Sequence, residues 1–192
     1  GWFYSLLAIG VGIFDRSPYQ NVMVNGLILA EDGRKMSKSL KNYPDMWPTI
    51  EKYGADSLRF FLACSPAVRG EEVAFSEKGL DEVNKKIFNR IDNMHSFLNM
   101  YALDEKGQPL ARADAKYSAA EVDAALAALK HPLDLWVIAR LYQTMGLVTT
   151  NLENYQLDKA TRPIGDLIDD ISTWYLRRSR DRFKVDSSDA AA

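Results

Sequence analysis

Residues 76–101, SEKGLDEVNKKIFNRIDNMHSFLNMY, carry the clearest helical pattern of the chain. Their apolar side chains recur at steps of three and four residues, at Leu80, Val83, Ile87, Ile91, Met94, Leu98 and Tyr101. That spacing lines one face of an α-helix and leaves the charged residues on the other faces. Ser76 directly precedes the pattern and is a favoured N-cap residue. The stretch therefore predicts one long amphipathic helix that runs to about residue 101 and needs other helices to bury its apolar face.

Residues 118–183 supply the expected partner helices. SAAE at 118–121 matches a capping box, in which a serine and a glutamate satisfy the first backbone N–H groups of a helix. Pro132 suits the first turn of a second helix, whose apolar residues are Leu133, Val137, Leu141, Val148 and Leu152. A last helix is expected over 158–183, and Pro163 either starts or kinks it. Three or four long helices with short connections predict a bundle.

The first 30 residues follow a different pattern. Residues 1–14 are apolar almost throughout, which predicts a buried helix or a buried strand, and periodicity does not decide between the two. Val22–Val24 and Leu27–Leu29 are two short runs with β propensity. Asp32–Gly33 then predicts a tight turn.

A helical pattern returns in DMWPTIEKYGADSLRFFLAC at residues 45–64. Gly54 is expected to break this helix and Pro66 to stop it. With the bundle that follows, the chain is expected to be mainly α, with a short β-containing part near its beginning. Residues 104–117 are expected to be a linker.

The composition is that of an ordinary globular chain. Of its 192 residues, 47% are hydrophobic and 26% are charged, which is enough apolar material for a packed core. The formal net charge is −2, so an anionic partner must be bound by local basic clusters. The single cysteine, Cys64, is expected to be buried; it excludes an internal disulfide and indicates a reducing compartment.

Two further function classes are disfavoured. His95 and His131 are too far apart in sequence for zinc-ligand spacing. The longest uncharged apolar stretch falls short of the roughly 18 to 20 residues that a membrane span needs. We therefore expect a cytoplasmic protein with no metal site of its own and no membrane segment.

A basic loop, GRKMSKSLKN, occupies residues 33–42. Lys35 and Lys38 are mobile cations, and their ammonium groups can converge on a polyphosphate as it gains charge during a displacement. The neighbouring serines add hydroxyl donors, and the methionine can hold the loop against an apolar surface. For a bare pair of lysines, a solvated basic turn is the usual alternative.

KMSKS at residues 35–39 follows NGLILAEDGR and precedes LKNYPD, and this whole context resembles the signature loop of class I aminoacyl-tRNA synthetases, in particular their isoleucine branch. GADSLRFFLACSP at 54–66 is similar to the helix that follows the loop in that family. TRPIGDLIDDISTWYLRRSRDRF at 161–183 resembles a segment of the family's anticodon-binding helical domain. The resemblance extends over most of residues 1–184.

This resemblance implies a domain organisation. Residues 1–70 would be the C-terminal remnant of an α/β, Rossmann-like catalytic domain and would carry the KMSKS loop and a region that contacts the tRNA stem. Residues 71–184 would form an anticodon-binding helical bundle, and 185–192 a disordered tail. The first half of the nucleotide-binding fold and the editing domain are absent, so the chain resembles an excised part of the larger enzyme.

The implied activity is the ATP-dependent attachment of isoleucine to its tRNA, through isoleucyl-adenylate and pyrophosphate. The residues implied in ATP binding are Lys35, Met36, Ser37, Lys38 and Ser39. Lys35 and Lys38 would be the catalytic residues, because they would stabilise the departing pyrophosphate together with Mg²⁺. The family's other signature, His-Ile-Gly-His, does not occur in this sequence. We therefore expect the chain alone to be inactive and to bind no cofactor tightly.

The partners implied are isoleucine tRNA, ATP and isoleucine. The candidate tRNA-binding residues are the basic side chains of the helices, namely Lys85, Lys86, Arg90, Arg177, Arg178, Arg180 and Arg182. The alternative for these residues is a solvated helix face with ion pairs to Asp169, Asp170 and Asp181. Trp136 and Trp174 could stack on unpaired bases, but their apolar surroundings favour core packing.

A second hypothesis is a stand-alone tRNA-binding module whose lysine loop is idle. Isoleucine-dependent exchange between ATP and pyrophosphate would separate the two. In either case, residues 32–42 are expected to be mobile without a ligand, because a loop that closes on ATP must open and close.

Overall fold

The computed structural model describes residues 1–103 and 116–183. The linker expected at 104–117 lies outside these residues except for 116 and 117, and the tail expected at 185–192 lies wholly outside them. Residues 77–101 form one continuous helical rod, as the spacing predicted. It consists of α4 (Glu77–Val83), a π-helical segment η2 (Asn84–Phe88) and α5 (Asn89–Tyr101). Ser76 is its N-cap, because Ser76 Oγ accepts a hydrogen bond from the backbone N–H of Gly79 at 3.1 Å. The π-helical turn was not predicted.

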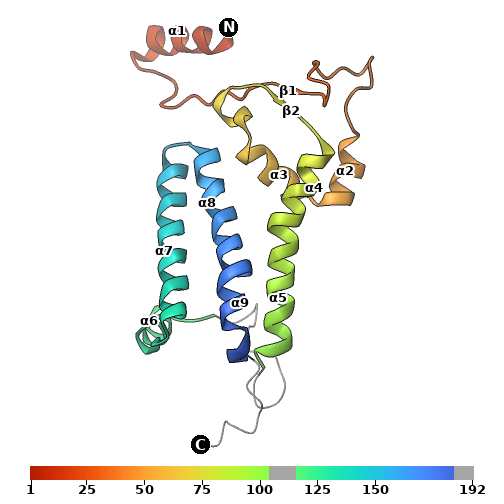
Figure 1. Ribbon diagram of the computed structural model, residues 1–192. Coiled ribbons are helices and arrows are strands. Elements are labelled where there is room, and N and C mark those ends of the chain that lie inside the picture. The colour runs from red at the N-terminus through yellow and green to blue at the C-terminus, as the bar shows by residue number, and fades with distance from the viewer. Residues whose placement is uncertain (104–115, 184–192) are drawn as a thin grey trace, which may run out of the picture.

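The remaining helices of the bundle also lie where the sequence predicted them. They are α6 (Ala119–Ala128), α7 (Pro132–Glu153) and α8 (Leu157–Asp169), and α8 continues through a π-helical segment η3 (Asp170–Tyr175), α9 (Leu176–Ser179) and η4 (Arg180–Phe183). The capping box at Ser118 and Glu121 is present. Pro132 stands in the first turn of α7, whereas Pro163 lies inside α8 and does not start it. The rods of α7, α8–α9 and α4–α5 run side by side (Figure 1).

The β structure is limited to two short parallel strands, β1 (Ile28–Leu29) and β2 (Val73–Ala74). The prediction of a run at Val22–Val24 was wrong, since no strand in the described part of the chain pairs with it. The turn at Asp32–Gly33 is confirmed, and Gly33 has φ +78°, a conformation that glycine adopts without strain.

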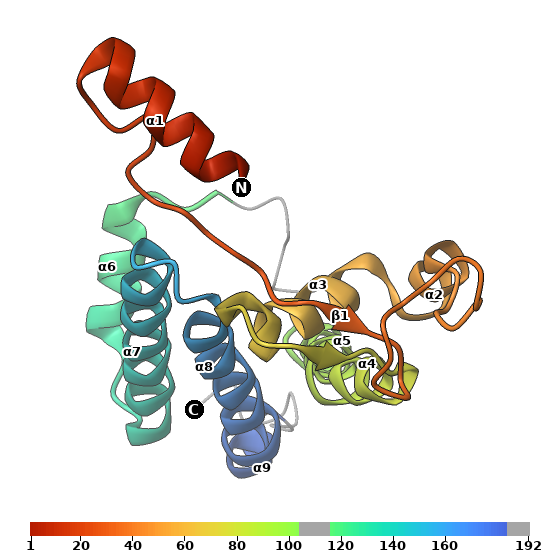
Figure 2. The same ribbon diagram turned by 90° about the horizontal axis from the view of Figure 1, so that it is seen from above.

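Residues 1–14 form a helix, α1 (Trp2–Phe14), but the expectation that it is buried was wrong. Gly10 is its only buried residue, and Trp2 is 70% exposed. Within the part of the chain that the structure describes, α1 contacts the segment that returns from it: Gly10 faces Pro18, and the Phe3 and Tyr19 rings meet edge to face. In the view from above, α1 lies apart from the bundle (Figure 2).

Two helices join the strands to the bundle, α2 (Met46–Tyr53) and α3 (Ala55–Cys64), followed by a 3₁₀ turn η1 (Pro66–Arg69). The predicted break at Gly54 and stop at Pro66 are both confirmed, and Gly54 has φ +82°. Cys64 is half-buried and not fully enclosed; this burial raises the pKa of its thiol.

The core lies where α3, α4 and α8 meet, and it includes Phe75, Leu80, Ile87, Ala160, Leu167 and Ile168. The fold class is therefore mainly α, as predicted, with the lysine loop on the strand side and the basic helices in the bundle. Among the residues described, no helix combines the length and apolarity that spanning a bilayer requires.

Candidate functional site

The lysine loop begins as a turn held by backbone hydrogen bonds. Gly33 N–H donates to Ala30 O, and Ala30 N–H donates to Arg34 O, both at 2.8 Å. Leu29 and Lys35 then form an isolated antiparallel bridge. Because Leu29 belongs to β1, the two-stranded sheet positions the start of the loop.

Asn42 closes the loop, and the sequence reasoning missed it. The backbone N–H of Ser37 donates to Asn42 Oδ1 at 2.9 Å, and Asn42 Nδ2 donates to Lys35 O at 3.1 Å. The hydroxyl groups of Ser37 and Ser39 are 2.8 Å apart. An asparagine at the end of a glycine-led turn was the available signal, since its side chain commonly hydrogen-bonds nearby backbone.

The two lysines of the loop point to solvent. Lys35 and Lys38 are exposed, and neither ammonium group has a carboxylate partner among the residues described. Lys38 lines an open cavity of about 460 Å³ together with Lys41, Tyr43, Asp45, Met46 and Trp47. Lys35 does not line it, so the structure does not bring the two lysines to one cavity. Both cations remain available to an anion.

Four of the seven candidate tRNA-binding residues are held in ion pairs. Lys85 pairs with Asp81 at 2.5 Å and Lys86 with Glu82 at 3.1 Å, both one turn away on the same helix. Arg90 pairs with Asp169 of α8. The fourth pair is that of Arg182, described next.

Arg182 binds the start of α7. Its two terminal nitrogens donate to the two carboxylate oxygens of Asp134, at 2.8 and 2.5 Å. The Tyr175 hydroxyl donates to Asp134 Oδ1 at 2.9 Å. The Arg182 guanidinium holds the pKa of the Asp134 carboxyl below its usual range, and burial raises the pKa of Tyr175. Of the three aspartates that the sequence suggested as partners of the basic helix residues, Asp169 pairs with Arg90, whereas Asp170 accepts two hydrogen bonds from Arg140.

The other three residues form what we call the arginine cluster: Arg177, Arg178 and Arg180. Within residues 1–103 and 116–183, none of the three has a carboxylate partner. Their charges are therefore not neutralised by the part of the chain that the structure describes.

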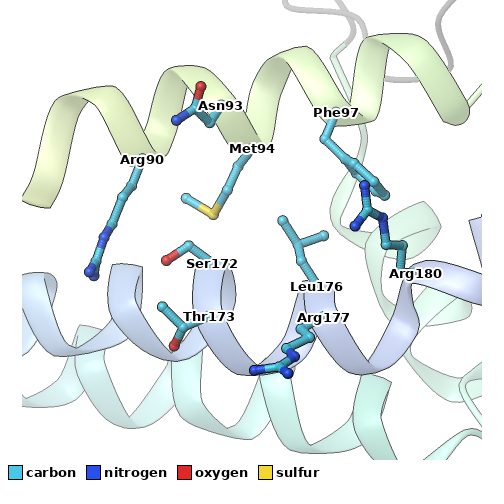
Figure 3. Close-up of a pocket in the computed structure, with 9 residues that line it drawn as sticks. All are labelled: Arg90, Asn93, Met94, Phe97, Ser172, Thr173, Leu176, Arg177 and Arg180. Carbon is cyan, nitrogen blue, oxygen red and sulfur yellow. The ribbon is translucent and has the colours of Figure 1, made fainter. Parts of the chain in front are cut away.

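A cavity of about 390 Å³ lies beside the arginine cluster, between α5 and the η3–α9 segment (Figure 3). Its lining residues are Arg90, Asn93, Met94, Phe97, Ser172, Thr173, Leu176, Arg177 and Arg180. Met94 and Leu176 point toward one another across it, and Arg90 and Arg180 stand at its two ends. Asn93, Ser172 and Thr173 were not singled out from the sequence, because each lies on the polar side of an amphipathic pattern.

The two tryptophans pack on each other. The Trp136 and Trp174 ring centroids are 4.4 Å apart, and Trp174 is 39% exposed. This contact supports the packing interpretation for Trp136. Trp174 also lines a second cavity of about 420 Å³ with Thr173, Arg177 and Arg178.

The described residues contain no group of three or more His, Cys, Asp or Glu side chains that could hold a metal ion.

Two family descriptions match the chain. Residues 1–74 match "tRNA synthetases class I (I, L, M and V)", and residues 134–192 match "Anticodon-binding domain of tRNA ligase". The first match covers the lysine loop and the second covers the arginine cluster.

Curated relatives match over almost the whole chain. "Isoleucine--tRNA ligase" of Chlamydia pneumoniae is 40% identical over 187 residues, which are 95% of this chain and 16% of the relative. The protein of the same name from Treponema denticola is 40% identical over 189 residues, 98% of this chain and 17% of the relative. The chain thus spans about a sixth of the length of these relatives.

One solved structure has a similar fold. It is the agnB2 LeuRS of Agrobacterium radiobacter K84, in a ternary complex with tRNA and LeuAMS. The TM-score is 0.65 at 15% sequence identity, and the match covers 93% of this chain and 20% of that one. At this identity the likeness concerns the fold.

Proposed function

Because the chain belongs to the class I tRNA synthetases, we propose that it is the part of an isoleucine–tRNA ligase that supplies the pyrophosphate-binding lysine loop and tRNA-binding helices. The observation that carries the RNA half is the arginine cluster, whose charges have no carboxylate partner among the described residues. The observation that carries the nucleotide half is the pair of exposed lysines on a loop anchored by β1 and closed by Asn42.

In the first step of the proposed reaction, the isoleucine carboxylate attacks the α-phosphate of ATP, and pyrophosphate leaves. Lys35 and Lys38 donate hydrogen bonds to the departing phosphates, and the hydroxyl groups of Ser37 and Ser39 add to these donors. Met36 is partly buried and anchors the loop between them. Mg²⁺ bound together with ATP would supply further stabilisation of the developing charge. The tRNA terminal hydroxyl then attacks the carbonyl carbon of isoleucyl-adenylate, the hydroxyl gives up its proton, and AMP leaves as the isoleucyl ester forms.

On the RNA side, we propose that the arginine cluster binds backbone phosphates of isoleucine tRNA. The neighbouring cavity suits an unpaired base, because its apolar floor of Met94, Phe97 and Leu176 can pack on a ring while Asn93 meets a polar edge. Lys85, Lys86, Arg90 and Arg182 contribute less, since a paired cation must first lose its carboxylate. The single cysteine agrees with a cytoplasmic location.

The experiment is a titration of the chain with isoleucine tRNA at several salt concentrations. Each phosphate contact that is lost should lower the slope of log affinity against log salt by about 0.7 to 0.9. We expect this change for Arg177→Ala and for Arg178→Ala. Arg59→Ala is the matched control, because Arg59 is an exposed arginine on α3 that pairs with Asp56.

No binding at low salt, or an affinity that neither salt nor the two substitutions alter, would remove RNA binding from this part of the chain. Isoleucine-dependent exchange of pyrophosphate into ATP tests the loop. We expect none from the chain alone, because it lacks the second phosphate-binding signature of the family.

A further inference from the structure

Asp158 is a buried charge that neither the lysine loop nor the arginine cluster uses. It lies in the first turn of α8, and its side chain is only 3% exposed. Arg69 Nη1 donates a hydrogen bond to Asp158 Oδ2, and Arg162 Nη2 lies 3.9 Å from the same oxygen. A carboxylate deprived of water needs such partners. The positive end of the α8 dipole adds to the stabilisation.

Arg69 belongs to the strand side of the molecule. Its Nε donates to Glu71 Oε1 at 3.1 Å, and Glu71 and Asp158 together raise its pKa. This turn is locked to the segment that leads into β1, because Gly26 N–H donates to Ala67 O at 2.7 Å. The approach is so close that a side chain at Gly26 would overlap the Glu71 carbonyl oxygen.

Arg69 and Asp158 therefore join the part of the chain that leads to the lysine loop to the helix that leads to the arginine cluster. From Arg69 the chain enters β2, which pairs with β1, and β1 leads into the lysine loop. From Asp158 the helix continues through η3 to the arginine cluster (Figure 1). At a rise of 1.5 Å per residue, Arg177 lies about 28 Å along this rod from Asp158.

We propose that Arg69 and Asp158 are a positioning pair that sets the orientation of the lysine loop relative to the arginine cluster. The consequence for the reaction rests on the proposed function: a tRNA held by the arginine cluster would present its end to the loop in one orientation only. Neither residue touches substrate in this role.

In this proposal the ion pair, and not apolar packing alone, selects the orientation of the lysine loop relative to the arginine cluster. α3 also packs against α8, but the hydrophobic contribution of such apolar contacts is non-directional. The Arg69 guanidinium is planar, and its donors point in fixed directions, so its match to a buried carboxylate is lost when the two units rotate. The pair thus favours one orientation among several that the apolar contacts would permit.

The test measures that orientation in the whole chain. Spin labels are placed at Glu31→Cys, in the turn before the loop, and at Ala139→Cys on α7, in a Cys64→Ala background. The distance distribution between the labels is then recorded. We expect one narrow peak for the parent and for Asp166→Asn, a control that removes from the same helix an exposed carboxylate with no ion pair among the described residues. We expect Asp158→Asn to lose the narrow peak.

A second variant separates orientation from stability. Arg69→Met with Asp158→Leu removes both charges of the pair, and the two partners that remain, Glu71 and Arg162, are exposed to solvent. Buried ion pairs often tolerate such a replacement without loss of stability. A folded double variant without the narrow peak supports the proposal; one that keeps it overturns the proposal, because packing would then set the orientation.

Arg69→Lys retains the positive charge and covers the case in which the uncharged variants do not fold. A broadened peak in this variant supports the pair, and a peak as narrow as that of the parent overturns it. Binding of tRNA to the parent chain is measured separately. Its absence would contradict the proposed function and leave the distance result unaffected.

Discussion

Arg182 shows that residue type alone does not tell whether a basic side chain is free to bind a phosphate. Its guanidinium meets both oxygens of Asp134, a residue 48 positions earlier in the chain. A guanidinium group that already donates two hydrogen bonds to a carboxylate can bind a phosphate in the same way only after it releases that carboxylate. Arg177 and Arg178, two helical turns or less away, carry no such partner among the described residues. The sequence identified all of these as candidates, but only the structure separates them by partner.

The first prediction concerns Asp134 and pH. Because Arg182 depresses its folded pKa, its contribution to the free energy of unfolding is present above the unfolded pKa and is lost as pH falls through the folded one. Asp134→Asn should therefore destabilise the chain at neutral pH by about 1 to 2 kcal/mol, the low end for a charged hydrogen bond because Arg182 is partly exposed.

The measurement is urea unfolding of the parent and the variant from pH 7 down to pH 3. The difference between them should shrink below pH 4. Asp166→Asn serves as the control and should show little difference at any pH. A constant difference across the range would mean that Asp134 acts through its shape and not through its charge.

At the scale of elements, the helices were predictable because their signals are local. The apolar spacing of residues 77–101, the capping box at Ser118 and the glycine at position 54 each involve neighbours within one or two turns. The π-helical segments were not predictable, since one extra residue in a turn leaves the three- and four-residue spacing nearly unchanged. The strand predicted at Val22–Val24 did not form because a strand needs a neighbouring strand to pair with, and local β propensity does not provide one.

The second prediction tests the N-cap of the rod that α4 and α5 form. Ser76→Ala removes the acceptor for the Gly79 N–H and should lower the free energy of unfolding by about 1 kcal/mol. Ser96→Ala is the matched control, because Ser96 is exposed in the interior of α5, where alanine is favourable. Equal effects of the two substitutions in thermal unfolding would argue against the cap.

At the scale of the whole molecule, the contacts that set the architecture join distant residues. β1 and β2 pair across 45 positions, and Arg69 reaches Asp158 across 89. Sequence patterns carry no information on such pairs, and for the same reason they did not show that α1 packs on Pro18 and Tyr19 and leaves Trp2 exposed. The expectation of a mobile loop at 32–42 stays a prediction, although Asn42 gives the loop internal hydrogen bonds.

The third prediction concerns the division of the chain near residue 70. α3 packs on both α4 and α8, and Phe61 meets Phe75 edge to face. We expect residues 71–183 to fold as a helical bundle, but with lower stability than residues 45–183, which retain α2 and α3. Fully burying one large apolar side chain contributes about 1.5 to 3 kcal/mol, so the loss around Phe75 and Leu80 should be measurable.

Circular dichroism with urea unfolding of both pieces makes the comparison. A clearly lower midpoint for 71–183 is the expected result. Equal midpoints would show that the contacts of α3 add nothing to the bundle.

The π-helical segment at Asp170–Tyr175 makes the number of residues, and not only their identity, a determinant of where the arginine cluster faces. Each residue turns an α-helix by about 100°, so if this wide turn tightened to α-helical geometry with no residue lost, Arg177, Arg178 and Arg180 would rotate together around the axis of the rod. Such a change would replace no arginine and yet turn the whole cluster. In the descent of such a protein, a codon gained or lost here can be absorbed by widening or tightening one turn, so that the charged surface keeps its direction.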